Sequence, residues 1–111
     1  MKIYIAGPMS GYPDNNYGAF LRKQQELEEA GWEVINPCEM DLEAGLRPDV
    51  EFTRKDYMRA ARRDLKALKS VDAIYMMSGY ENSPGANWEW AFAKEEGILI
   101  YYEIPLCGSD E

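Results

Sequence analysis

Short runs of β-branched and aromatic residues alternate along this chain with helical patterns, and this alternation most constrains the fold. The strand-like runs lie at residues 2–6, 32–37, 71–77 and 98–102. Between them lie a helical segment that Asn15 or Asn16 caps and Gly31 closes, a second over 52–69 and a third over 85–96. Strands separated by helices predict a parallel sheet with right-handed crossovers.

The predicted fold class is α/β: a three-layer sandwich with a four- or five-stranded parallel sheet, flavodoxin- or Rossmann-like. A length of 111 residues, 46% of them hydrophobic, is enough for one modest core, so residues 1–111 are predicted to form one domain. Residues 38–50 are expected to form a long, acidic, irregular connection. The helix over 52–69 is expected to turn one apolar stripe inward: Tyr57, Met58, Ala61, Leu65 and Leu68.

Composition argues for a cytoplasmic protein with no membrane partner. The apolar runs fall far short of the ~20 residues that span a bilayer, and the first residues lack the apolar core of a signal peptide. Cys38 and Cys107 have no CxxC spacing and the chain has no histidine, so neither a disulfide framework nor a metal site is predicted.

The net charge of −8 disfavours nucleic acid as a partner, because a phosphate backbone requires neutralising cations. The charge is uneven. Residues 54–69 hold seven of the twelve cations and two acids, which gives that segment +5 and the remainder −13. A solvated helix face explains this best, and a site for an anionic partner is the alternative.

Two loops are expected at the carboxyl ends of strands, where open α/β sheets bind ligands. Residues 7–11, Gly-Pro-Met-Ser-Gly, offer backbone amides and a hydroxyl to an anion or sugar, although a tight turn is the alternative. Residues 79–89 lead into the third helix, with Ser83 at the N-cap, Pro84 in the first turn and Gly85 open to a ligand.

Three side chains are candidates for chemistry. Glu89 stands among aromatic residues and alanines, where a carboxylate is costly unless it is used; the alternative is an acid placed near the positive end of the helix dipole. As a nucleophile, Glu89 is expected to be kept ionised by the helix N-terminus. Asp64 borders the apolar stripe and is either catalytic or a buried acceptor for a loop amide. Tyr4 points toward the same cleft, with a core tyrosine as the alternative.

Three segments resemble, in order, the nucleoside 2-deoxyribosyltransferases and their relatives, the deoxynucleoside 5′-monophosphate N-glycosidases. They are Tyr-Ile-Ala-Gly-Pro at 4–8, Arg-Asp-Leu at 63–65 with Val-Asp-Ala at 71–73, and Ser-Pro-Gly-Ala-Asn-Trp-Glu at 83–89. Asp64 stands 25 residues before Glu89, which is similar to the spacing of the family's sugar- or base-holding aspartate and its glutamate. The likeness spans nearly the whole chain and is nearest to small phage and bacterial members.

The resemblance implies that Glu89 attacks the anomeric carbon and forms a glycosyl-enzyme, which water or a second base resolves. Tyr4 would orient Glu89, and Asp64, a tyrosine or water would protonate the leaving base. It also implies a nucleoside or nucleotide partner, no metal or organic cofactor, and at least a homodimer. The implied substrate-binding residues are Gly7, Pro8, Met9, Ser10, Ser83 and Gly85.

Position 83 separates the two branches of the resembling family. The transferases carry an acid six residues before the glutamate, whereas the monophosphate hydrolases tend to have serine, as here. Ser83 therefore favours cleavage or transfer of a 2′-deoxynucleoside 5′-monophosphate. The 7–11 loop lacks the arginine of those hydrolases, so a transferase acting on unphosphorylated deoxynucleosides is the first alternative.

Three rival functions lie outside this interpretation. One is a noncatalytic nucleotide-binding or sensing module, and another is a phage interaction protein that uses the aromatic residues at 88–92 and 101–102 as an interface. The third is a phosphoribohydrolase of the cytokinin-activating type, whose longer glycine-threonine motif is missing here.

Overall fold

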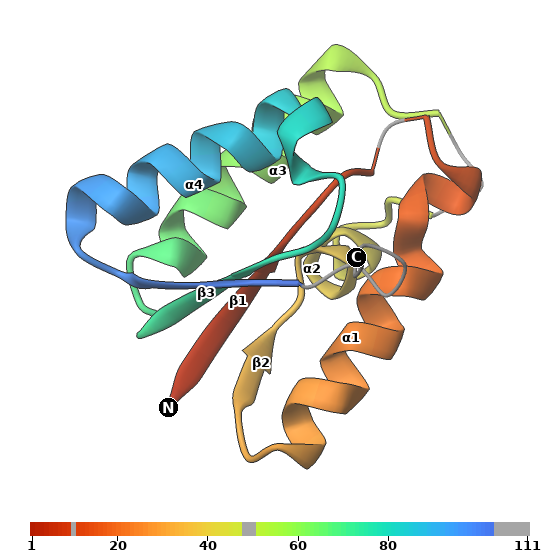
Figure 1. Cartoon of the computed structure of the whole chain (residues 1–111). Helices are drawn as coiled ribbons and strands as arrows, with labels where there is room; N and C mark the ends of the chain where they lie inside the picture. The colour runs from red at the N-terminus through yellow and green to blue at the C-terminus, as the bar shows by residue number, and fades with distance from the viewer. Residues whose placement is uncertain (10, 48–50, 104–111) are drawn as a thin grey trace.

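The computed structural model describes residues 1–9, 11–47 and 51–103, which form a four-stranded sheet with helices on both faces (Figure 1). All pairings are parallel, and the strand order is β2-β1-β3-β4. The predicted α/β sandwich with a parallel sheet is therefore confirmed, with four strands. The strands are β1 (Lys2–Ala6), β2 (Glu33–Ile35), β3 (Ala73–Met76) and β4 (Leu99–Tyr102).

The helices form the outer layers. In Figure 1, α1 (Tyr17–Glu29) lies against one face of the sheet, and α3 (Arg54–Leu68) and α4 (Pro84–Glu96) lie on the other. Short 3-10 turns, η1 (Pro13–Asn16) and η2 (Tyr80–Asn82), precede α1 and α4. No helix in the described part of the chain is long and apolar enough to cross a membrane.

Strand β1 is central and divides its side chains between two cores. Ile3 and Ile5 join the core under α1, whereas Tyr4 and Ala6 join the core under α3 and α4. Alternation along a strand produces this division, because successive side chains point to opposite faces. The register pairs Tyr4 with Ile35 on one side and with Ile74 on the other. The aromatic ring therefore enters the molecule from the middle of the sheet.

The expectation of an irregular 38–50 connection is wrong for its first part. A further helix, α2 (Pro37–Glu43), follows β2 directly and contacts both α1 and α3. Asn36 caps it by accepting a hydrogen bond from the Cys38 amide at 2.9 Å, and Pro37 occupies the first turn. Residues 48–50 of the predicted connection lie outside the described residues.

Two local expectations are wrong in part. Only Leu68 of the apolar stripe is fully buried; Tyr57 is 47% exposed where it lines a cavity, and Met58 is 50% exposed. Asn16 occupies the N-cap position of α1, as expected, but its side chain makes no capping bond; its amide donates to the Pro8 carbonyl at 2.8 Å. Asp14, Asn15 and Asn16 all adopt positive φ, a conformation that Asn and Asp tolerate better than other residues with a side chain.

Candidate active site

A cavity of about 540 Å³ opens at the carboxyl end of β1, where the strand order reverses direction. This is the position at which open α/β sheets bind ligands, and the volume suits a small molecule. The β1 loop, α2, the first half of α3 and the start of α4 all contribute lining. Its lining includes Gly7, Pro8, Met9, Phe20, Asp41, Phe52, Tyr57, Asp64, Ser83, Gly85, Trp88 and Glu89.

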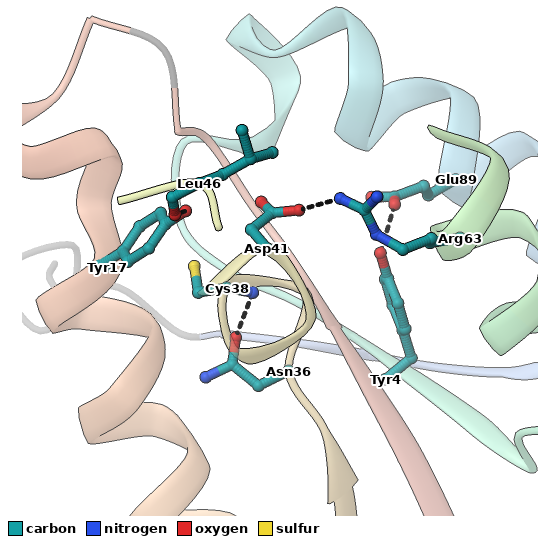
Figure 2. Close-up of polar contacts among 8 residues, drawn as sticks. All are labelled: Tyr4, Tyr17, Asn36, Cys38, Asp41, Leu46, Arg63 and Glu89. Carbon is teal, nitrogen blue, oxygen red and sulfur yellow. Dashed lines mark hydrogen bonds and ion pairs between the residues drawn. The ribbon is translucent and has the colours of Figure 1, made fainter. Parts of the chain in front are cut away.

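Tyr4 and Glu89 form the closest polar contact in this region (Figure 2). The Tyr4 hydroxyl donates to Glu89 Oε2 at 2.6 Å, the short distance typical of a bond to a carboxylate. Tyr4 is fully buried, and Glu89 is only 9% exposed. Strand β1 and helix α4 therefore fix the Glu89 side chain against the cavity wall.

The environment of Glu89 favours its protonated form. Burial raises the pKa of Glu89 to about 8, the charges of Asp64 and Asp41 add to this, and the hydrogen bond from Tyr4 opposes it. The expectation that the helix dipole keeps Glu89 ionised is therefore wrong. Glu89 lies beyond the first turn of α4, where the dipole acts weakly, and desolvation dominates.

Asp64 lies in the same cavity as Glu89, as predicted from its place on the helix. Burial, with the nearby charge of Asp41, raises its pKa to about 7, and Tyr4 and Arg63 oppose the shift. Its Oδ1 atom is buried and has no hydrogen-bond partner among the described residues. That oxygen accepts no bond from a described loop amide.

The predicted substrate-binding residues Gly7, Pro8, Met9, Ser83 and Gly85 line the cavity. Ser10, the remaining predicted substrate-binding residue, lies outside the described residues.

Two of these residues also have clear structural roles. A side chain at Gly7 would place its Cβ 2.8 Å from that of Met77, so only glycine fits where the loop leaves β1. Ser83 caps α4, as predicted, by accepting from the Ala86 amide at 3.2 Å.

Sequence reasoning missed Asp41, which α2 places in the cavity wall. Its side chain is only 4% exposed, and Arg63 Nη2 approaches Oδ1 at 3.0 Å (Figure 2). Burial raises the pKa of Asp41, and the Arg63 guanidinium acts against this shift. The Asn36-Pro37 pair, a common start of a helix, was the signal that could have revealed α2 and hence Asp41.

The described lining is rich in carboxylates. Asp41, Asp64 and Glu89 all contribute to it, and no lysine or arginine is among its described residues. Within the described ranges, no group of three or more potential ligands is placed to hold a metal ion. Two neighbouring carboxyls with raised pKa values can divide the work of nucleophile and acid between them.

Residues 1–102 match the family described as a domain of unknown function, DUF4406. This chain belongs to the DUF4406 family. Among solved structures, this DUF4406 protein is similar to the 2-deoxyribosyltransferase from the psychrotolerant bacterium Bacillus psychrosaccharolyticus, with a TM-score of 0.67 and 24% sequence identity. The match covers 95% of this chain and 77% of the other, and it bears out the resemblance at the level of the fold. No curated protein matches the sequence.

Proposed function

We propose that this protein cleaves or transfers the N-glycosidic bond of a 2′-deoxynucleoside, with Glu89 as the nucleophile. The observation that carries the proposal is the Tyr4–Glu89 hydrogen bond inside a cavity that Asp64 also faces. A buried carboxylate held by a tyrosine beside a second acid is the arrangement that covalent glycosyl transfer requires. The activity named for the structurally similar enzyme, 2-deoxyribosyl transfer, supports the same reaction class.

In the proposed reaction, a Glu89 carboxylate oxygen bonds to the anomeric carbon while the bond from that carbon to the base nitrogen breaks. The electron pair leaves with the base, and Asp64 supplies the proton that neutralises it. Water or a second base then attacks the anomeric carbon and releases Glu89. A proton from the incoming group returns to Asp64, which restores the starting state.

Burial raises the pKa values of both carboxyls toward neutrality, to about 8 for Glu89 and about 7 for Asp64. The two groups are therefore able to share one proton, and Glu89 attacks only after that proton has been transferred to Asp64. Positive charge that develops on the sugar beside Glu89 in the transition state favours that transfer.

The described cavity lining favours an unphosphorylated substrate. Asp41, Asp64 and Glu89 line the cavity and no described lysine or arginine does, so no described lining side chain neutralises a phosphate dianion. A 5′-monophosphate is the second candidate, because Ser83 places a hydroxyl at the start of α4, where a phosphate is favoured. The first candidate predicts faster turnover of the free nucleoside, and the second predicts faster turnover of its monophosphate.

The decisive experiment incubates the protein with the common 2′-deoxynucleosides and their 5′-monophosphates, with and without a second free base. Chromatography then measures the base released or exchanged. We expect turnover of at least one substrate and a loss of about 10³-fold or more in Glu89→Gln, because only the transition state needs the carboxylate. Glu95→Gln, an exposed neighbour on α4, is the matched control. Ligand binding without turnover would instead favour the sensing module.

A further inference from the structure

Three aromatic side chains, Phe20, Phe52 and Tyr57, line the part of the cavity next to α1 and the start of α3, and together they form its aromatic wall. Phe20 and Phe52 are buried, and Tyr57 is 47% exposed. The rings of Phe52 and Tyr57 lie 5.5 Å apart at 51°. A flat heteroaromatic ring is the kind of ligand that such a surface favours, because stacking and edge contacts between rings add to apolar burial.

Two carboxyl groups, Asp64 of α3 and Asp41 of α2, lie beside this aromatic wall in the cavity lining. The Asp41 side chain comes from α2, is almost completely buried and lines the cavity. Its Oδ1 atom is paired with Arg63 at 3.0 Å. Burial raises the pKa of this carboxyl, and the nearby guanidinium acts against the shift by favouring the ionised form. Figure 2 shows the side chain reaching from α2 toward α3. An ionised carboxylate only accepts hydrogen bonds, so this position selects for a donor.

Two further polar atoms of α3 lie near this group without being satisfied. Arg63 Nε and Asp64 Oδ1 are both buried and have no hydrogen-bond partner among the described residues. Buried polar atoms in folded proteins are normally paired. Asp64 lines the cavity, so its unpaired Oδ1 atom indicates where a ligand makes a polar contact. The charge of Asp41 acts on Asp64, so the two carboxyls lie near each other.

We propose that this wall is the nucleobase subsite and that Asp41 accepts a hydrogen bond from an exocyclic amino group of the base. The inference rests on the proposed function, since it takes the ligand to be a nucleoside. It adds a substrate class: bases with an amino group, such as adenine and cytosine, are selected over the matched oxo bases hypoxanthine and uracil.

The physical reason for this selection is repulsion as much as attraction. An amino group gives Asp41 a charge-assisted bond, whereas a carbonyl in the same place sets two acceptors against each other in a buried site. Sites that are built to bond one polar group reject analogues lacking it by large factors. We expect at least a 10-fold preference, which corresponds to about 1.4 kcal/mol.

The test measures binding of free bases by calorimetry, so it does not depend on turnover. The wild-type protein is titrated with adenine against hypoxanthine and with cytosine against uracil. We expect the amino base of each pair to bind at least 10-fold more tightly. Asp41→Asn, which can also donate, should reduce that ratio several-fold, and Glu43→Gln, an exposed acid on the same helix, should preserve it.

Equal binding of amino and oxo bases by the wild-type protein would overturn the inference, even if Asp41→Asn failed to fold. An unchanged ratio in a folded Asp41→Asn protein would overturn it as well. Either result, together with cleavage of deoxynucleosides, would leave the proposed function standing. If amino bases are preferred but no deoxynucleoside is cleaved, the proposed function fails while the base subsite stands.

Discussion

Tyr4 and Glu89 lie 85 positions apart in the chain, yet the tyrosine hydroxyl meets the carboxylate at 2.6 Å in the interior of the protein. The contact joins the central strand β1 to helix α4, so the sheet itself sets the position of the proposed nucleophile. This hydrogen bond also lowers the Glu89 pKa, whereas burial raises it; the resulting pKa is about 8. The contact therefore fixes the position of Glu89 and favours its ionised form against the effect of burial.

Replacing Tyr4 by Phe should raise the Glu89 pKa further, because the bond that favours the ionised form is lost. We expect kcat/KM to fall about 10- to 100-fold near pH 7, and the rising limb of its pH profile to move to higher pH. The measurement is a pH–rate profile on a deoxynucleoside that the wild-type protein turns over. Tyr101→Phe, which alters an exposed tyrosine on β4, serves as the control. A lower rate with an unmoved profile would show that Tyr4 acts only on packing.

The stability of the protein should fall as pH rises from about 4 to about 8. The folded pKa values of Asp64 and Glu89, about 7 and 8, lie above those of an unfolded chain, so the folded state holds more protons in this window. The stabilisation is fully present below pH 4 and is lost toward pH 8. A difference of one between a folded and an unfolded pKa corresponds to about 1.4 kcal/mol, and coupling between the two groups reduces their sum.

Glu89→Gln should flatten this pH dependence and make the protein more stable than wild type at pH 8, because no buried charge then forms. Urea unfolding at a series of pH values measures the effect. Glu95→Gln should leave the slope as it is in the wild-type protein. A wild-type stability that increases steadily over this range would contradict the raised pKa values.

Asp64→Asn should lower the rate of base release, and the loss should be larger for a substrate whose base needs a proton in order to leave. We expect a loss of about 10²-fold or more on ordinary deoxynucleosides, the usual size of general acid catalysis. A 7-methylguanine deoxynucleoside, whose base already carries a positive charge, should lose far less. Single-turnover rates of base release make the comparison. Equal losses on both substrates would assign Asp64 to binding or structure.

The protein should be at least a homodimer. Apolar side chains remain exposed in the described part of the chain on α3, α4 and β4, among them Met58, Trp88 and Leu99, each about half exposed or more. Exposed apolar side chains mark a protein contact where they form one contiguous patch. Light scattering at micromolar concentration should give a mass at least twice that of one chain. A monomer mass would contradict the prediction.

The parts of the site predicted correctly follow from the rule that parallel strands meet with their carboxyl ends at one edge. That rule brings the β1 loop to the loop before α4, and helical periodicity turns Asp64 toward the same edge. The strand at 2–6 and the start of α4 at Ser83-Pro84 were also predicted correctly. The first has a run of β-branched and aromatic residues, and the second has a capping serine followed by proline.

The missed parts depend on contacts that the sequence does not display. Helix α2 is short, too short for its periodicity to stand out, and its packing against α1 and α3 sustains it. Asp41 therefore appeared as one more acid in an acidic stretch. Arg63 appeared as part of a basic helix face, although tertiary packing directs it to Asp41. The protonation of Glu89 likewise depends on burial, which sequence position alone misjudged.

The paired carboxyls of the cavity have a practical consequence for anyone handling this protein. The chain has no histidine, the side chain that ordinarily buffers between pH 6 and 8. Protons that the folded protein takes up in that range, beyond those taken up by its unfolded form, therefore report mainly on Asp64 and Glu89. Cys38, whose pKa burial also raises, adds to the difference toward pH 8. A potentiometric difference titration thus monitors the cavity without a label. A ligand that lowers the proton affinity of either carboxyl would acidify an unbuffered solution as it binds.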